Sequence, residues 1–408
     1  MTFDVAAIRQ EFPIFHVRPH GKQLHYLDNG ATAQMPRAVL DAIVRHETTA
    51  RANVKRSVHY LAEAATDAFE TARGALAQFV NADEPDEVVI TSGCTGAINL
   101  LANSYGALLH PGEEILISHL EHHSNIVPWQ MVAERRGLVL KAIPATADGR
   151  LDLDSLERLV TPRTRLIAVT HVSNVTGAET DVARVVAAAR SVGARVMLDG
   201  AQRAAHGDLD VQELGVDFYA CSGHKMFGPN GVGILWGRAD LLQRMPPFLG
   251  GGEMIHRVTI ERSSFAPPPH RFEAGTPPIA QAVGMGVAAK WIQGLDLDGA
   301  HEHLMTLTGR LLDGLASLPK VRVIGPAGLQ QRYPVVSFAV EGAHPHDICQ
   351  ILDRDGVALR GGHHCAQPLM DAFGITGTTR ASLACYNDRS DVDALLNGLE
   401  DAIAKLCR

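Results

Sequence analysis

No stretch of this 408-residue sequence approaches the roughly 20 consecutive apolar residues that a membrane-spanning helix needs. The opening residues, MTFDVAAIRQEFPIF, contain acidic side chains and lack the apolar run of a signal peptide. These two absences predict a cytoplasmic protein without a membrane partner.

Runs of positive charge are absent as well. The chain has 37 Lys and Arg residues against 45 Asp and Glu residues, and its formal net charge is -8. No series of Lys and Arg forms a stripe that would follow a phosphate backbone, so we expect no nucleic-acid partner. The sequence also shows no internal repeat and no low-complexity tract.

Cysteines are few and scattered, and no Cys-x-x-Cys pair occurs among them. A disulfide framework is not expected in a cytosolic protein of this size, and most of these thiols are predicted to be small buried apolar groups. Cys365 differs, because it lies in the polar, glycine-rich stretch GGHHCAQP. The six cysteines are Cys94, Cys221, Cys349, Cys365, Cys385 and Cys407.

Apolar residues make up 46% of the chain, enough for a large core and two domains. Short apolar runs alternate with helical patterns between residues 87 and 237: EVVIT, EILIS, LIAVTHVS, RVMLDG, DFYACS and GVGILWG. This alternation predicts an α/β fold with a mostly parallel, doubly wound sheet. Glycine- and proline-rich stretches after residue 240 predict long loops, and the remaining pattern predicts a smaller α+β domain.

Two predicted strand ends carry residues that suit one cofactor. Asp199 and Gln202 follow one strand, and Ser222, His224 and Lys225 follow a later one. Pyridoxal 5′-phosphate (PLP) needs a lysine for its Schiff base and a carboxylate beside its ring nitrogen. A surface lysine and an N-capping aspartate are the alternative, but the neighbouring Ser222 and His224 favour the cofactor.

Other strand ends add weaker signals. Gly93, Thr95 and Gly96 open a predicted helix, and such a turn binds phosphate through free backbone N–H groups, although many α/β loops look alike. The pair His122 and His123 follows another strand, where an imidazole could stack on a cofactor ring or belong to an ordinary loop.

The Cys365 thiol has three possible roles. Adjacent His363, His364 and Cys365 do not have the spacing of a zinc site, and a structural disulfide does not suit the cytosol. A nucleophile fits better, because a glycine-rich loop can bring the thiol over a cofactor, and the histidines and Arg360 can favour the reactive thiolate.

Taken together and in this order, the motifs resemble those of cysteine desulfurases, in the group that includes SufS and CsdA within the class V aminotransferase superfamily. The motifs are YLDNGATAQMP, EHHSNIVPWQ, THVSNVTG, DGAQ, SGHKMFGPNGVGILWG, RFEAGTP, RGGHHCAQPL and TRASLACYN. The resemblance implies the type I PLP-dependent transferase fold and a homodimer. It also implies an N-terminal arm (1–17) packed on the small domain, a large PLP-binding domain (18–290) and a small C-terminal domain (291–408).

The same resemblance assigns roles at the cofactor. Lys225 would form the Schiff base, Asp199 would pair with the ring nitrogen, and Gln202 would contact the ring hydroxyl side. His123 would stack on the ring and relay protons. The phosphate would be held by Thr95, Ser222, His224 and, from the partner subunit, Thr276.

At the substrate, Arg380 would bind the carboxylate and Cys365 would be the nucleophile. Asn174, Arg360, His59 and Ala31 would line the same pocket. No residue is assigned to a metal.

The activity implied is conversion of L-cysteine to L-alanine, with a persulfide left on Cys365. The sulfur would pass to a SufE- or CsdE-like acceptor protein for iron–sulfur cluster assembly. Selenocysteine lyase is the alternative, with L-selenocysteine as substrate. An aminotransferase or a kynureninase-like hydrolase would not need Cys365, and an inactive scaffold or sulfur-carrier partner would not need Lys225 and Asp199.

The chain departs from the family pattern at two places. Cys94 stands where the family has a hydroxyl side chain, which we place on the phosphate side of the cofactor. The loop at 266–269 is rich in proline, and its stiffness is expected to alter how a partner subunit covers the site.

Overall fold

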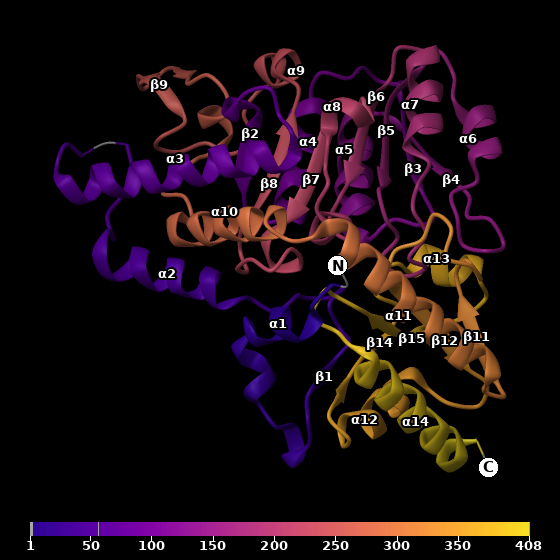
Figure 1. The fold of residues 1–408 in the computed structure, drawn as a ribbon. Helices are drawn as coiled ribbons and strands as arrows, with labels where there is room; N and C mark the ends of the chain where they lie inside the picture. Colours follow the sequence, from indigo (N-terminus) through magenta and orange to yellow (C-terminus); the bar gives the residue numbers. More distant parts are fainter. Residues whose placement is uncertain (1–2, 56, 408) are drawn as a thin grey trace.

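The computed structural model describes residues 3–55 and 57–407. A large domain is built around a seven-stranded sheet and a smaller one around a four-stranded sheet (Figure 1). Within the described residues, no helix is both long and apolar enough to cross a membrane.

The large sheet is mostly parallel, as predicted. Its strand order is β2 (Val88–Thr91), β8 (Gly233–Gly237), β7 (Phe218–Ser222), β6 (Arg195–Asp199), β5 (Thr164–Thr170), β3 (Glu114–Ser118) and β4 (Val139–Ile143). Neighbours from β7 to β4 run parallel, whereas β8 is antiparallel to both of its neighbours. The parallel strands therefore bring their carboxyl ends to one edge of the sheet.

Each face of this sheet has its own core, because the central strands are apolar on both faces. One face packs against α4 (Cys94–Gly106), α5 (Val127–Arg136) and α9 (Ala239–Arg244). The other packs against α3 (Tyr60–Val80), α6 (Leu153–Leu159), α7 (Val182–Ser191), α8 (Val211–Leu214) and α10 (Ile279–Gln293). Asp181 caps α7 by accepting a hydrogen bond from Arg184 N.

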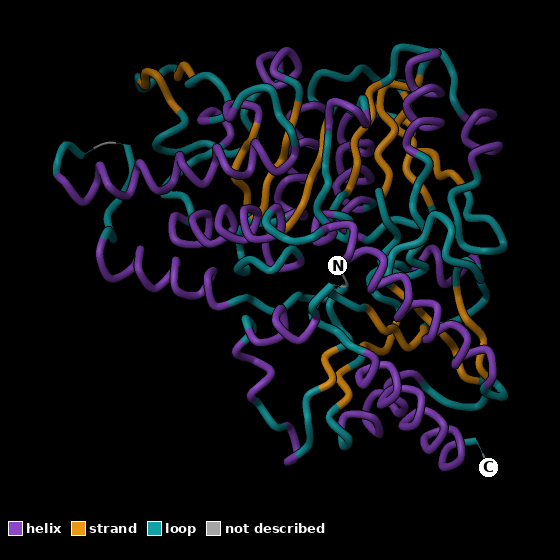
Figure 2. The backbone as a smooth tube through the Cα atoms, in the orientation of Figure 1, coloured by secondary structure: helices purple, strands orange, loops and turns teal. Residues whose placement is uncertain are grey.

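The small domain has an antiparallel sheet in the order β11 (Val321–Ile324), β12 (Val335–Val340), β15 (Thr378–Ser382) and β14 (Arg360–Gly362). Its helices are α11 (Leu297–Ser317), α12 (Pro345–Asp353), α13 (Gln367–Ala372) and α14 (Arg389–Leu406), as Figure 2 shows below the large sheet. The short β1 (His25–Tyr26) pairs with β13 (Val357–Ala358), so the chain near residue 25 lies with the small domain.

Two parts project from the body. Helix α2 (Arg37–Thr49) and the first turns of α3 extend to one side in Figure 1. The segment after residue 250, predicted as loop alone, contains a short hairpin of β9 (Ile255–Val258) and β10 (Ser263–Phe265). Its strands have exposed side chains, so the hydrophobic pattern that announces a strand is missing there.

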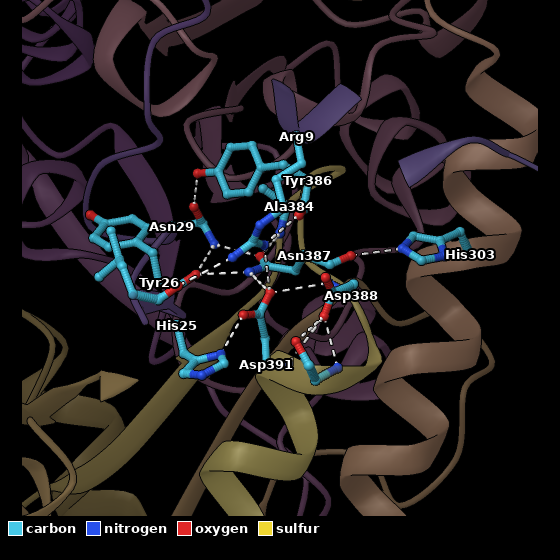
Figure 3. Close-up of polar contacts among 12 residues, drawn as sticks. Arg9, His25, Tyr26, Asn29, His303, Ala384, Tyr386, Asn387, Asp388 and Asp391 are labelled. Carbon is cyan, nitrogen blue, oxygen red and sulfur yellow. Dashed lines mark hydrogen bonds and ion pairs between the residues drawn. The ribbon is translucent and has the colours of Figure 1, made fainter. Parts of the chain in front are cut away.

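A polar network ties the N-terminal segment to the small domain (Figure 3). Arg9, from α1 (Val5–Gln10), donates to Asp391 Oδ2 at 3.0 Å and to the Tyr386 carbonyl at 2.9 Å. His25 Nδ1 lies 2.8 Å from Asp391 Oδ1, and Asn387 Nδ2 donates to Asp391 Oδ2 at 2.9 Å. The carboxylate of Asp391, fully buried in the first turn of α14, therefore joins three segments.

Replacing Asp391 by Asn is expected to lower the free energy of unfolding by about 3–5 kcal/mol at neutral pH, because it leaves Arg9 without its buried partner. Burial alone would raise the pKa of Asp391, but the hydrogen bond from His25 and the charge of Arg9 hold this pKa below its usual value. Its contribution is thus present above the ordinary aspartate pKa and is lost as pH falls through the lowered value. Urea unfolding of both proteins across this range should show the difference shrink at low pH; a constant small difference would contradict the assignment.

Candidate active site

A cavity of about 230 Å³ lies at the carboxyl ends of the parallel strands, where the large sheet meets β14 and β15. Eleven of the predicted site residues line it: Ala31, Cys94, Thr95, Asn174, Asp199, Gln202, Ser222, His224, Lys225, Arg360 and Arg380. The structure thus brings together side chains from segments that are up to about 350 residues apart in the sequence.

Lys225 and Asp199 reach the cavity from adjacent strands. Asp199 ends β6, and Lys225 ends a 3-10 turn that follows β7 directly. Burial lowers the pKa of Lys225, and the Asp199 carboxylate opposes this shift. A lysine of lowered pKa is more often a neutral amine, which is the form that attacks a carbonyl group.

The Cys94 side chain does not lie where we expected it. Its Sγ donates to Asp199 Oδ1 at 3.3 Å rather than serving the phosphate side. Burial, with the charge of Asp199, raises the pKa of Cys94 well above its usual value, so the thiol keeps the proton it donates. Ala201 N donates to the same Oδ1 at 3.0 Å. Two donors on Oδ1 fix the carboxylate and leave Oδ2 for a further partner.

The start of α4 forms an anion site. Gly93 has a φ of 113°, which L-residues rarely adopt, and this turn exposes the first N–H groups of the helix. Cys94 N already donates to Ser222 Oγ at 2.7 Å, and Thr95 and His224 line the cavity beside it. The helix N-terminus and these polar groups match the requirements of a phosphate.

Arg380 also lines the cavity. Its Nη1 donates to the Asn174 carbonyl at 2.9 Å and its Nη2 to Asp28 Oδ1 at 3.1 Å, whereas its buried Nε has no hydrogen-bond partner among the described residues. Burial lowers the pKa of Arg380, and Asp28 opposes this shift. Arg360 lies on the same cavity wall, so two guanidinium groups are available to a carboxylate.

The two adjacent histidines lie differently with respect to the cavity. His122 lines the cavity, and His123 does not. Both contacts of the His122 ring, to Ser124 Oγ at 2.6 Å and Ser124 N at 3.1 Å, use Nδ1. Burial, with Lys225 nearby, lowers the pKa of His122 to about 4. Stacking on a cofactor ring therefore suits His122, whereas His123 turns toward the small domain.

Cys365 lies in the loop between β14 and α13, where it is partly exposed. It is not among the cavity-lining residues, but His364 from the same loop and Arg360 from β14 are. His364 turns its Nε2 to Thr378 Oγ1 at 2.9 Å, which does not suit a shared metal site with Cys365. All six cysteines are free thiols.

Two predicted site residues lie elsewhere in the chain. His59 is exposed at the start of α3, where its ring accepts from Ala62 N at 3.3 Å. Thr276 lines a separate cavity of about 430 Å³ with Phe248, Leu249 and Phe272. Neither contacts the cavity of its own chain, so a role there needs a second copy.

Six cavity-lining residues were not predicted: Gly30, His122, Ser124, Thr170, Ala201 and His364. The sequence identifies the pair His122 and His123, but the resemblance assigns ring stacking to His123 rather than to His122. Thr170 is the first residue of THVSNVTG and Ser124 lies within EHHSNIVPWQ, and no chemistry peculiar to their residue type distinguishes them.

Comparison with known proteins agrees with this geometry. Residues 25–395 match the family described as aminotransferase class-V. A probable cysteine desulfurase of Streptomyces coelicolor is 47% identical over 97% of this chain and 96% of its own length. The crystal structure of the cysteine desulfurase CsdA from Escherichia coli has a TM-score of 0.92 and 40% identity, with complete coverage of both chains. A C-DES mutant with glycine covalently linked to its PLP cofactor has a TM-score of 0.81 and 26% identity, over 96% of this chain and 99% of that one.

The fold and the cavity define a type I PLP-dependent enzyme, as predicted. The chain belongs to the class-V aminotransferase family, and the relatives it matches along nearly its whole length are cysteine desulfurases. The residues fit the cofactor of this family, because one cavity offers a partly buried lysine, a fixed carboxylate and a helix N-terminus.

Proposed function

We propose that this protein is a PLP-dependent cysteine desulfurase that converts L-cysteine to L-alanine and leaves the sulfur as a persulfide on Cys365. The observation that carries the proposal is the combination of Lys225, Asp199 and Arg380 around one cavity with a partly exposed thiol in an adjacent loop. An aminotransferase has no use for that thiol.

Different residues would hold different parts of the cofactor. Lys225 would hold it covalently, Asp199 Oδ2 would face its ring nitrogen, and His122 would stack on the ring. Thr95, Ser222 and His224 would hold its phosphate at the start of α4. When bound, PLP supplies an electron sink that stabilises negative charge at the substrate Cα.

The protein groups would then act on the substrate in order. Arg380 binds the carboxylate of L-cysteine, with Asn174 and Arg360 beside it, and Lys225 removes the proton from Cα. The Cys365 thiolate forms a bond to the substrate sulfur while the bond from that sulfur to Cβ breaks. Cβ takes up the equivalent of the proton that the substrate thiol gives up, and Cα regains the proton that Lys225 removed, which completes L-alanine; the sulfur remains as a persulfide on Cys365.

We propose a homodimer and a protein acceptor for the sulfur. Val58 and Tyr60 are 95% and 79% exposed next to His59, and Thr276 lies in its own partly apolar cavity, as expected if both meet a second copy. Because Cys365 is partly exposed, a SufE- or CsdE-like acceptor could reach its persulfide. Six free thiols suit a reducing compartment such as the cytoplasm, and iron–sulfur cluster assembly is the proposed use of the sulfur.

The test is product analysis with the PLP-loaded protein. With L-cysteine and a thiol reductant, we expect equal amounts of alanine and sulfide. No alanine from L-cysteine, with alanine still formed from L-selenocysteine, would overturn the proposal in favour of a selenocysteine lyase. Pyruvate, or a keto acid formed with amino-group transfer, would also overturn it.

A further inference from the structure

The loop that carries Cys365 is held from the large domain at three points. His123 N donates to the Cys365 carbonyl at 2.7 Å, and Gln367 N donates to His123 Nε2 at 3.2 Å. Asn174 Nδ2 donates to the His364 carbonyl at 2.8 Å. Two of these three bonds belong to His123, and both hold the backbone from the Cys365 carbonyl onward, whereas the Asn174 bond holds the residue before the thiol.

The loop needs such support because its backbone is unusual. His364 and Cys365 have φ values of 52° and 55°, a left-handed conformation that residues other than glycine rarely adopt. Two such residues in succession persist only where the surroundings hold them. Inside the loop, Cys365 N donates to His363 Nδ1 at 3.0 Å, so the turn is closed on itself as well.

We propose that His123 is a positioning residue, which fixes the loop in the conformation that presents Cys365 to the substrate sulfur. Its ring does this by accepting the Gln367 N–H bond, and its main chain by holding the Cys365 carbonyl. The expected effect on turnover of L-cysteine rests on the proposed function. The expected effect on the order of the loop does not.

The ring nitrogen involved sets the chemical requirement. A ring that accepts at Nε2 must be neutral and carry its proton on Nδ1. Burial, with His363 nearby, lowers the pKa of His123, which keeps the ring in this form at neutral pH. The His123 and His363 ring centroids are 5.6 Å apart, so His363 packs beside the acceptor rather than replacing it.

This requirement provides a matched pair of variants. In His123→Gln, the side-chain oxygen can occupy the place of Nε2 and accept the same bond. In His123→Asn, the shorter side chain reaches only the place of Nδ1. Both variants keep the main-chain bond to the Cys365 carbonyl. They therefore differ only in whether the side chain can accept the hydrogen bond from Gln367 N.

The first readout is hydrogen–deuterium exchange of the segment 363–372 in the PLP-loaded protein. We expect faster exchange in His123→Asn and exchange close to wild type in His123→Gln. The cofactor absorbance should be unchanged in both, because His123 does not line the cavity. Equal exchange in all three proteins would overturn the proposal.

The second readout is turnover of L-cysteine. His123→Asn should lower kcat by about 10-fold, with a small change in KM, since a displaced nucleophile costs rate more than binding. His123→Gln should recover most of that loss. If no protein in the series forms alanine but exchange still follows the pattern, the proposed function fails and the positioning role stands; an equal kcat loss in both variants would overturn the positioning role.

Discussion

Lys225→Ala protein is expected to fold normally, to lose the absorbance of lysine-bound cofactor and to lose turnover by at least about 10⁴-fold. The structure gives two reasons. Lys225 lies partly buried in the cavity one strand away from Asp199, and it is the only lysine among the described residues that line this cavity. No other amine can therefore bind the cofactor covalently or take the proton from the substrate Cα.

The electrostatics of Lys225 make the loss specific. Burial lowers its pKa, and Arg380 and Arg360 add to this effect while Asp199 opposes it. A Lys225→Arg variant keeps a positive charge in the same place but has no amine that becomes neutral, so it should be as inactive as Lys225→Ala. Both losses would then reflect the chemistry of the amine rather than the missing charge.

The measurement is the visible absorbance spectrum after PLP is added, together with alanine production. Lys290→Ala, on the exposed face of α10, is the matched control and should keep both signals. Unchanged cofactor absorbance and turnover in Lys225→Ala would refute the assignment.

The core of this site could be predicted because parallel strands impose a rule. The runs RVMLDG and DFYACS form β6 and β7, and adjacent parallel strands bring Asp199 and the Ser222–Lys225 region to the same edge. The direction of β8 was not predicted. GVGILWG has the same apolar character as the parallel strands, and its antiparallel direction follows from the connection after β7, which is too short for a helical crossover.

Neighbouring residues with the same chemistry could not be told apart. His122 and His123 differ only in which side of the backbone they occupy, and the 3-10 turn that begins at His123 decides this. Cys94 likewise occupies the expected turn, but its rotamer and the position of Asp199 determine where the thiol points. Such choices depend on tertiary contacts that a single sequence does not show.

Cys365→Ala protein should retain the cofactor spectrum and lose sulfide release from L-cysteine by at least about 10²-fold. The thiol is separate from the proposed cofactor-binding residues, because this loop lines the cavity through His364 and not through Cys365. Its thiolate still influences Arg380: burial lowers the pKa of that guanidinium, and Asp28 and, more weakly, Cys365 oppose the shift. The thiol is therefore close to the group proposed to bind the substrate carboxylate, yet not needed for binding PLP.

Cys94 and Cys349 are unsuited to replace it. Cys94 is in the cavity, but it is 4% exposed, its pKa is raised well above the usual value by burial and Asp199, and its proton is donated to Asp199. Cys349 is partly exposed in the small domain, but burial raises its pKa to about 12. A nucleophilic thiol must ionise, so neither suits the attack on the substrate sulfur.

The experiment compares cysteine variants and locates the persulfide. Wild type, Cys365→Ala, Cys365→Ser and the control Cys349→Ala are loaded with PLP and given L-cysteine, and persulfide is located by mass spectrometry. We expect persulfide on Cys365 in wild type and Cys349→Ala alone, since a serine hydroxyl cannot form a persulfide. Cofactor spectra should match in all four proteins. Wild-type sulfide release from Cys365→Ala would show that sulfur leaves the substrate without a protein thiol, and GGHHCAQP would then need another role.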